Sequence, residues 1–455
     1  MTAVEVQPFE VEAQPLEVEV RAVLPRGFRA GAATAGIKAS GRPDLAVIVI
    51  DGEPAAVAAT FTANQVPAAP VLLDRRHLAA TAPEGRGRYG VVRALISTSG
   101  CANAATGPGG MADQERLADV LATAAGTAPE LTLAVSTGLI GTRLPVEKIE
   151  PVLRRLVAEG LTADDAGLAA VAEAMRTTDS RSKLAAVRIE LPGPDGRGVP
   201  VVVSGVAKGV GMIHPRMATM LSFVLTDAAA RPELLSALLR PAVARTWNQL
   251  SVDGDTSTND TVLLVASGAS GAAPVTAGTQ EAAALAAAIE AVARSLARQQ
   301  AADGEGATRL ITCRVSGGRD DAEARAVARA IVSSSLLKAA VHGNDPNWGR
   351  ILGAAGNAHL ADPAVLLAAG LPEDEAERRG GKPVALDPAT LRASVCGIAV
   401  FDGAPLPFDR PVASAAMHAP EVVIEIGLGE GAGSGEAFGC DLTEEYVREN
   451  SEYST

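Results

Sequence analysis

The stretch KGVGMIHPRMATMLSFVLTDA, residues 208–228, says most about how this chain folds and what it does. It begins with Lys208 among glycines, which is typical of a ligand-binding loop, and it ends in the apolar run of a buried strand. Thr219 lies at the junction, between Ala218 and Met220, with no obvious base beside it. Since a threonine hydroxyl is a weak nucleophile until a base takes its proton, spacing alone favours a strand residue.

Cleavage of the Ala218–Thr219 bond would change the chemistry of Thr219. The new α-amino group would have an ordinary pKa of about 8, which suits a general base near neutral pH. Lys208 would lower that pKa further, because like charges disfavour the protonated form. Such a nucleophile needs no His or Asp partner, which fits a chain with only five histidines. Both interpretations of Thr219 stay open at this point.

The composition sets the class of protein. A chain of 455 residues is too long for one ordinary core, so two or three lobes are expected. Aromatic residues make up only 3%, so the cores must be packed from small and branched side chains. The formal net charge of −13 argues against binding to nucleic acid or to a membrane surface through basic faces. It does not exclude a local cationic pocket.

Metal binding and export are also disfavoured. The four cysteines form no CxxC pair, and the five histidines form no HxH or HExxH pattern, so we expect neither a metal site nor a disulfide scaffold. The first 24 residues carry five glutamates and lack the features of a signal peptide. No apolar run approaches the ~20 residues of a membrane span, so a cytoplasmic protein is expected.

Hydrophobic periodicity predicts strands and helices mixed along the chain, and hence a layered α/β architecture with mixed sheets. We expect strands near 46–50, 91–100, 131–141, 184–190, 199–205, 261–266, 308–315, 393–403 and 421–429, and one in the apolar run that ends the stretch 208–228. We expect helices near 146–156, 163–175, 231–248, 278–302 and 321–337, and a short one at the C-terminus. Residues 1–24 are interpreted as a flexible or edge-pairing acidic extension, and 371–388 as a surface insertion.

Three loops invite functional interpretations. In STGLIG (136–141), the hydroxyl of Thr137 and the backbone amide at Gly138 could stabilise an oxyanion, although a plain strand-to-loop turn is the alternative. VDGDTSTNDTVLL (252–264) lacks calcium-loop spacing and is interpreted as a polar turn with self-satisfied side chains. GLGEGAGSG (427–435) is interpreted as a tight turn, because no helix follows it as in a dinucleotide site.

Seven segments taken in order carry a resemblance: STGLIG, MRTTD, AKGVGMIHPRMATML, VDGDTSTNDT, ADGEGATR, DPNWGRIL and CDLTEEYVRENSEYST. Together they resemble the ornithine acetyltransferases, or glutamate N-acetyltransferases, of the bifunctional arginine-biosynthesis ArgJ family. The resemblance runs from about Gly27 to the last residue. It implies a DmpA-like, self-processing α-β-β-α fold with mixed sheets and a smaller C-terminal α+β lobe at about 340–455.

The resemblance also implies residue roles. Cleavage between Ala218 and Thr219 would give an α chain (25–218 after the extension) and a β chain (219–455), with Thr219 as the nucleophile. Thr137 and Gly138 would stabilise the oxyanion. The implied substrate-binding residues are Thr177, Lys208, Thr219, Glu305, Asn450 and Thr455. Lys208 can pair with an α-carboxylate and Glu305 with a distal ammonium group, whereas Asn450 and Thr455 require the C-terminal tail to dock.

The implied reaction is ping-pong acetyl transfer from N-acetylornithine through an acetyl-Thr219 ester to glutamate. It needs no metal or cofactor; acetyl-CoA is a second donor in some members, and an α2β2 heterotetramer is expected. Three alternatives stay open: an N-terminal-nucleophile aminopeptidase or amidase, a binding protein that has lost activity, and a secondary-metabolite paralogue acting on another amino acid.

Three residues depart from the expected family pattern. Cys101 stands where Asn is expected, in a loop that could line the site, and this puts substrate preference in question. His214 and Arg216 stand where smaller or neutral residues are usual. They would alter the rate of self-cleavage or favour an acidic substrate; the alternative is that both face solvent.

Overall fold

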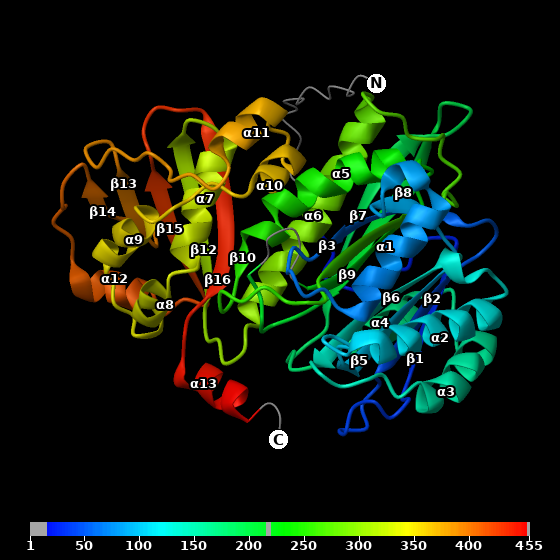
Figure 1. Ribbon diagram of the computed structural model, residues 1–455. Helices are drawn as coiled ribbons and strands as arrows, with labels where there is room; N and C mark the ends of the chain where they lie inside the picture. The colour runs from blue at the N-terminus through cyan, green and yellow to red at the C-terminus, as the bar shows by residue number, and fades with distance from the viewer. Residues whose placement is uncertain (1–15, 215–219, 453–455) are drawn as a thin grey trace.

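The structure is a computed structural model that describes residues 16–214 and 220–452. Arg216, Ala218, Thr219 and Thr455 therefore lie outside the described residues. Figure 1 shows a lobe of two stacked sheets on the right, a second lobe on the left, and the long helix α6 (Gln280–Ala302) between them.

Two sheets form the larger lobe. The four-stranded sheet has the order β1 (Phe28–Ala33), β2 (Leu45–Ile50), β5 (Ala94–Cys101) and β6 (Thr132–Leu139). The six-stranded sheet has the order β4 (Tyr89–Val92), β3 (Ala55–Phe61), β11 (Thr261–Ala266), β9 (Leu221–Thr226), β8 (Gly198–Lys208) and β7 (Lys183–Pro192). The covering helices are α1 (Ala69–Thr81), α2 (Gly107–Ala125), α3 (Val146–Glu159), α4 (Asp165–Met175) and α5 (Pro232–Arg245), together with α6.

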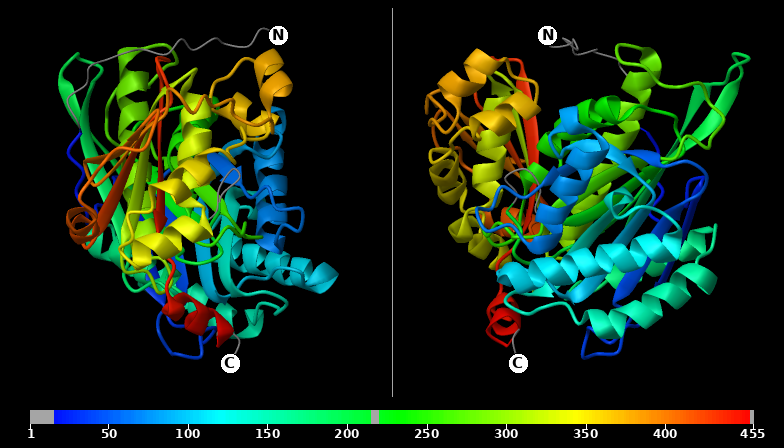
Figure 2. Two further views of the ribbon diagram at one scale, coloured as in Figure 1. Left: turned by 90° about the vertical axis from the view of Figure 1, so that its left-hand side faces the viewer. Right: turned by 45° about the vertical axis from the view of Figure 1, so that its right-hand side comes forward.

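The layer order follows from the alternation of side chains along the strands. In β2, Ala46, Ile48 and Ile50 lie in the core between the two sheets. The intervening Leu45, Val47 and Val49 pack with α2 and α3 on the outer face. Because successive strand residues point to opposite faces, one apolar run supplies two cores. The outer face of the six-stranded sheet packs against α5 and α6, which confirms the α-β-β-α order (Figure 2).

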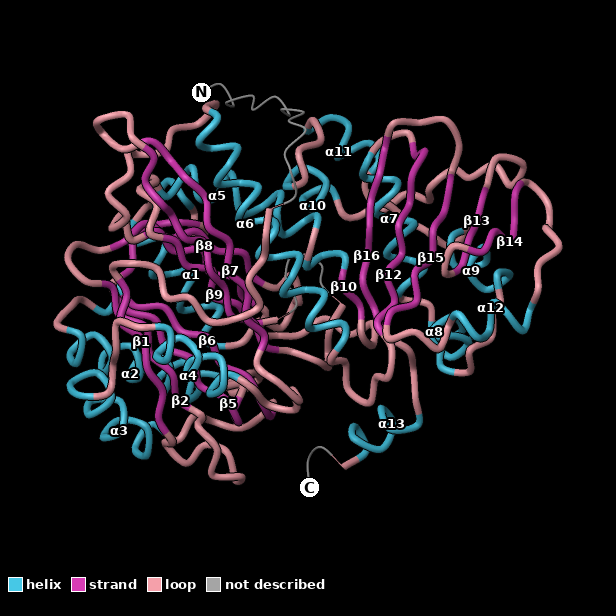
Figure 3. Tube along the Cα trace, turned by 180° about the vertical axis from the view of Figure 1, so that it is seen from behind, coloured by secondary structure: helices cyan, strands magenta, loops and turns pink. Residues whose placement is uncertain are grey.

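The third sheet belongs to the C-terminal lobe, and Figure 3 shows its strands from behind. Its order is β10 (Leu250–Ser251), β16 (Gly433–Cys440), β12 (Leu310–Gly318), β15 (Glu421–Gly427), β13 (Arg392–Val395) and β14 (Ile398–Asp402). Its helices are α7 (Asp321–Val332), α8 (Ser335–His342), α9 (Trp348–Ala355), α10 (Pro363–Ala368), α11 (Glu373–Arg379) and α12 (Arg410–Ala416), and α13 (Glu444–Ser451) ends the described chain. Since β12 and α7 belong to this lobe, it begins before residue 340.

Three predicted elements are each divided in two, and one of them, the strand expected at 393–403, is the antiparallel pair β13 and β14. The strand expected at 91–100 is β4 followed by β5, with Arg93 between them. The helix expected at 321–337 ends at Val332, and α8 then begins with Ser334 as its cap, whose side chain accepts a hydrogen bond from the Leu337 N–H. A serine that caps a new helix turns the chain, and hydrophobic periodicity does not detect this.

The acidic extension (1–24) and the segment 371–388, which were expected to lie outside the core, both contain described residues that contact the rest of the protein. Glu19 pairs with Ala186 of β7 through two backbone hydrogen bonds of 2.8 Å, so the described part of the acidic extension lies along a sheet edge. Most of segment 371–388 is exposed, but it contains α11, whose Ala376 and Arg379 are buried. Arg379 pairs with Asp320, at the start of α7. Among the described residues, no helix is both long and apolar enough to cross a membrane.

Candidate active site

One cavity of about 340 Å³ brings together residues that are far apart in the sequence. Its lining includes six of the residues that the resemblance implicates: Thr137, Gly138, Thr177, Lys208, Glu305 and Asn450. Met220 and Leu221, which directly follow Thr219 in the sequence, line the same cavity. Ala218, Thr219 and Thr455 lie outside the described residues.

The end of β6 supplies Thr137 and Gly138. Strand β6 runs parallel to β5, and the two backbones approach closely at this point. Gly138 has φ +126°, and a Cβ atom added there would lie 2.3 Å from the carbonyl carbon of Gly100. Only glycine fits both the backbone angle and the contact. The sequence therefore fixes a sharp strand end at the wall of the cavity.

Lys208 stands at the end of β8 and is buried, with 7% of its surface exposed. Its Nζ donates to Thr177 Oγ1 at 2.7 Å and to Thr137 Oγ1 at 3.3 Å. Burial lowers the pKa of Lys208, and the charge of Asp179 opposes this effect. The lysine is thus a buried cation held between two hydroxyls of the cavity wall.

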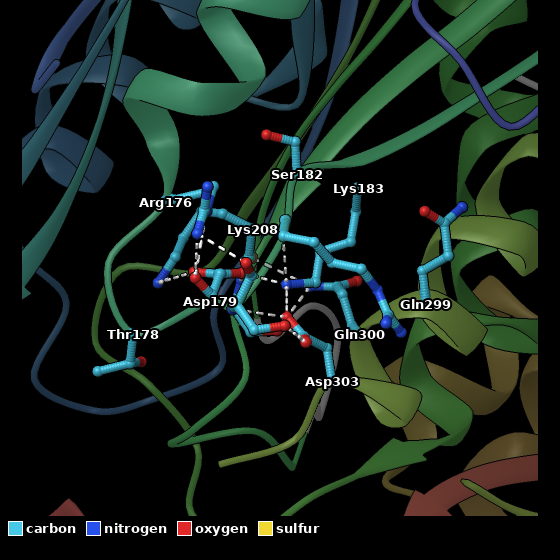
Figure 4. Close-up of polar contacts among 12 residues, drawn as sticks. Arg176, Thr178, Asp179, Ser182, Lys183, Lys208, Gln299, Gln300 and Asp303 are labelled. Atoms are coloured by element: carbon cyan, nitrogen blue, oxygen red, sulfur yellow. Dashed lines mark hydrogen bonds and ion pairs between the residues drawn. The ribbon is translucent and has the colours of Figure 1, made fainter. Parts of the chain in front are cut away.

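A second layer of charges lies behind Lys208 (Figure 4). Asp179 Oδ2 lies 3.8 Å from Lys208 Nζ, and Asp179 Oδ1 lies 2.6 Å from Lys183 Nζ. Lys183 also pairs with Asp303 Oδ2 at 2.5 Å. Burial raises the pKa of Asp179, but the charges of Lys208 and Lys183 outweigh it and hold the pKa well below its usual range. The sequence interpretation missed all three second-layer residues.

Glu305 brings a carboxylate to the cavity wall, which Asp260 also lines. Its Oε1 accepts a hydrogen bond of 2.8 Å from Thr178 Oγ1, and its Oε2 accepts one of 2.9 Å from Asn450 Nδ2. Gly211 lies so close that an added Cβ would fall 2.2 Å from Glu305 Oε2. Asn450 belongs to α13, so the C-terminal segment docks on the cavity as far as this residue. Glu305 is buried, with 8% of its surface exposed.

The polar run at 252–264 is more than a turn with self-satisfied side chains, so that interpretation is wrong. Asn259 donates to Ala102 O at 2.7 Å and to Ser136 O at 2.9 Å, and the carboxylate of Asp253 accepts from the N–H groups of Met212 and Ile213. Ser257, Thr258, Asn259 and Asp260 all line the cavity. The position of this run in the sequence could have indicated its role. The run precedes β11, which pairs in parallel with β9, so both strands begin at the same end of the sheet.

Two of the three residues that depart from the family pattern, Cys101 and His214, are among the described residues. The side chain of Cys101 is buried, with Sγ 3.2 Å from Thr142 O, while its neighbour Ala102 lines the cavity. His214 does not simply face solvent: its Nδ1 lies 3.0 Å from Ser251 Oγ, and it lines a separate cavity of about 640 Å³ between α5, α7 and α10. Arg216 lies outside the described residues.

The first cavity therefore presents a fixed cation and a fixed carboxylate to the same small molecule. That arrangement suits an amino acid with an α-carboxylate and a second, cationic end. Thr137 and Gly138 add a hydroxyl and a backbone N–H on the same wall, of the kind that stabilise an oxyanion.

Comparisons with known proteins show the family to which this chain belongs. The model of the ArgJ family matches residues 29–455. The arginine biosynthesis bifunctional protein ArgJ of Thermus thermophilus is 46% identical over 432 residues, covering 95% of this chain and 99% of the relative. That of Deinococcus radiodurans is 42% identical over 432 residues, covering 95% and 98%.

Two solved structures are similar over part of the chain. The ArgJ protein of Bacillus halodurans is 36% identical, with a TM-score of 0.44, and covers 50% of this chain and 97% of its own. The ornithine acetyltransferase of Mycobacterium tuberculosis complexed with ornithine is 37% identical, with a TM-score of 0.38, and covers 44% and 97%. Because the family model and the relatives span almost the whole chain, the protein belongs to the ArgJ family of bifunctional arginine-biosynthesis proteins.

Proposed function

We propose that this protein transfers the acetyl group of N-acetylornithine to glutamate, in the cytoplasm and as a step of arginine biosynthesis. The observation that carries the proposal is the single cavity lined by Lys208, Glu305 and the Thr137–Gly138 pair. The names of the relatives and the bound ornithine of the Mycobacterium protein support the same substrate class.

The reaction begins with self-cleavage at Ala218–Thr219, which frees the α-amino group of Thr219. That amine takes the proton of the Thr219 hydroxyl, and the oxygen attacks the acetyl carbonyl of N-acetylornithine. The Thr137 hydroxyl and the Gly138 N–H stabilise the oxyanion that forms. The C–N bond breaks, ornithine leaves with the proton, and the acetyl group remains on Thr219 as an ester.

The second half reverses these steps with a different amine. The α-amino group of glutamate attacks the ester, the C–O bond to Thr219 breaks, and N-acetylglutamate leaves. Lys208 binds the α-carboxylate of each substrate in turn, and Glu305 binds the distal ammonium group of the ornithine moiety. Thr177, Asn450 and Thr455 complete the substrate pocket. These steps use no metal or cofactor.

Assembly and the second donor are further parts of the proposal. The two chains formed by cleavage assemble as an α2β2 heterotetramer, which size-exclusion chromatography with light scattering tests. Acetyl-CoA is tested as a donor by offering it with glutamate in place of N-acetylornithine. A secondary-metabolite paralogue would instead prefer another amino acid over both ornithine and glutamate.

The deciding experiment combines mass analysis with a turnover assay. The purified protein should consist of two fragments, one beginning at Thr219, and ornithine release from N-acetylornithine should depend on glutamate. Release without glutamate would identify an aminopeptidase or amidase, and an intact chain without turnover would identify a binding protein.

Two variants locate the nucleophile. Thr219→Ala should abolish both cleavage and transfer, because both reactions need the hydroxyl. Ser222→Ala is the matched control: it removes another hydroxyl from the same apolar run, one that donates to Val206 O at 2.9 Å away from the cavity. The control should keep both reactions, and activity retained in Thr219→Ala would overturn the mechanism.

A further inference from the structure

The loop between α4 and β7 contacts both charged ends of the cavity. Thr177 accepts the hydrogen bond from Lys208, and the next residue, Thr178, donates to Glu305. Ser180 donates through its backbone N–H to Asp303 Oδ2 at 3.0 Å, two residues before Glu305. The position of this loop therefore sets the positions of the cation and the carboxylate relative to each other.

Asp179 is the buried charge at the centre of this loop, with 2% of its surface exposed. Its Oδ1 accepts from the Gly209 N–H at 2.9 Å and pairs with Lys183, while its Oδ2 accepts from the Thr177 N–H at 3.1 Å. The carboxylate is 3.8 Å from Lys208 Nζ, which is an ion-pair distance but too long for a hydrogen bond. Asp179 thus offers Lys208 charge without taking one of its donors.

The hydrogen-bond donors of Lys208 show why it matters that Asp179 accepts none of them. An ammonium group has three N–H donors. Within the part of the chain that the structure describes, two of them are directed to Thr177 and Thr137. The third donor can meet a substrate carboxylate, provided that the buried amine stays protonated.

Lys183 and Asp303 complete the charge balance. Lys183 is fully buried between Asp179 and Asp303, so the second layer consists of two carboxylates and one ammonium group. Together with Lys208 the formal charges of the four groups cancel. Asp303 is the counter-charge of Lys183, and Asp179 also lies within ion-pair distance of Lys208, so a substrate carboxylate meets a cation that has no direct hydrogen bond to its own counter-charge.

We propose that Asp179 is a positioning residue of the transfer reaction: it acts through Lys208, keeping the ammonium group charged and leaving one of its donors to the substrate carboxylate. This inference rests on the proposed function, since it assigns Lys208 the carboxylate of the substrate. It concerns a residue that does not itself line the cavity.

The proposal has a consequence for the pH dependence of activity. Lys208 binds a carboxylate only while it is protonated, so kcat/KM should fall as the pH rises through the pKa of Lys208. Burial and the charge of Lys183 lower this pKa, and Asp179, Glu305 and Asp260 raise it. Lys38, in the loop after β1, also faces Lys208. Among these groups Asp179 makes the largest opposing contribution to the effect of burial.

The test compares three variants with the unchanged protein by measuring kcat/KM for N-acetylornithine, at saturating glutamate, from about pH 6 to about pH 10. In Asp179→Asn, the fall of kcat/KM on the alkaline side of the pH profile (the alkaline limb) should move to lower pH by about 1–3 pH units. This is the usual effect of removing an opposite charge at this distance. Lys183→Gln should move the limb up, because it removes a like charge. Asp303→Asn is the matched control, since it removes a buried charge that pairs with Lys183 and makes no ion pair with Lys208. Its limb should stay within about half a pH unit of the unchanged protein.

The shifts of opposite sign separate positioning from structural damage, because a distorted fold would lower activity without moving the limb in both directions. An unmoved limb in Asp179→Asn, or an equal shift in Asp303→Asn, would overturn the proposal. If Asp179→Asn does not fold, Lys183→Gln carries the test, and a downward shift or none would refute it. If the unchanged protein transfers no acetyl group, the proposed function fails. In that case the same shifts must be found in the pH dependence of ornithine binding by calorimetry.

Discussion

Replacing Lys183 by methionine should lower the free energy of unfolding by about 3–5 kcal/mol, the usual effect of removing one partner of a buried ion pair. The reason lies in the geometry of the site. Lys183 is fully buried and holds Asp179 at 2.6 Å and Asp303 at 2.5 Å, and neither carboxylate is exposed by more than 5%. Methionine has a similar volume, so the change removes the charge and leaves little empty space. Two carboxylates then face each other in a region that water does not reach.

This loss of unfolding free energy corresponds to a decrease in the melting temperature. The entropy of unfolding is about 2.1 cal/mol/K per residue, or about 1 kcal/mol/K for a chain of 455 residues. The expected decrease in Tm is therefore about 3–5 °C.

The loss of unfolding free energy in Lys183→Met should be larger at high pH than at low pH. The pKa of Asp179 is held below its usual range, so its contribution to stability is present above the unfolded value of about 4 and is lost as the pH falls through the folded value. In Lys183→Met the two neighbouring carboxylates repel each other, and acid relieves this repulsion by protonation. The deficit should therefore be largest near pH 8 and smaller near pH 5.

The assay is thermal unfolding at both pH values and one scan rate, with Lys338→Met as the matched control. Lys338 is also buried, with 3% of its surface exposed, but among the described residues its Nζ contacts only Ser251 O at 3.4 Å and Cys440 Sγ at 3.7 Å, with no carboxylate in ion-pair range. Its replacement should be neutral or stabilising, since it removes a poorly compensated charge. A deficit below about 1 kcal/mol for Lys183→Met, or the same deficit in both variants, would refute the reasoning.

Two further substitutions test other parts of the structure. Gly211→Ala would place a Cβ 2.2 Å from Glu305 Oε2, so kcat/KM for N-acetylornithine should fall about 10–100-fold, whereas Gly353→Ala, in open space on α9, should leave it unchanged; equal activities would show that Glu305 moves freely. Burial raises the pKa of Asp74 well above its usual range, and the Ala134 N–H at 2.9 Å only partly opposes this, so the protein loses stability as the pH rises toward that pKa. Asp74→Asn should therefore gain about 1 kcal/mol or more near pH 8 and nothing near pH 4 in urea unfolding, and a loss near pH 8 would contradict this interpretation.

The strands that form the central layers were predictable, because their period-two or continuous apolar runs record burial on two faces. Strand β16 was not, because its sequence GSGEAFGC has the composition of a loop. Its glycines have a tertiary cause: a Cβ at Gly435 would lie 2.6 Å from Arg325 N on α7, and one at Gly433 would lie 2.1 Å from Asp320 C. Such a contact between segments far apart in the chain leaves no local pattern that a single sequence could reveal.

The cavity residues were found through the order of seven motifs. Spacing alone favoured a strand residue at Thr219, and a turn in STGLIG and in VDGDTSTNDTVLL. The second layer was missed because lysine and aspartate are rarely fully buried, so their presence in a sequence does not indicate a buried charge cluster. Asp179 lay inside the motif MRTTD and Asp303 inside the motif ADGEGATR, but neither had an assigned role. Only the packing of β7 against the end of α6 brings the three together, and local sequence does not specify that packing.

The same buried cluster explains how an acidic protein can take up a carboxylate substrate. With a net charge of −13, the surface as a whole repels anions, so recognition of a carboxylate must be local. At physiological ionic strength the Debye length is about 8 Å, so salt screens the exposed charges of the surface. Salt hardly affects the interaction between Lys208 and Asp179, which are buried and lie 3.8 Å apart. Replacing exposed glutamates of the surface should therefore change KM little in physiological salt. Removing the buried charge of Asp179 should change KM more than these surface replacements do. The reason is that Lys208 faces this counter-charge through protein and not through water.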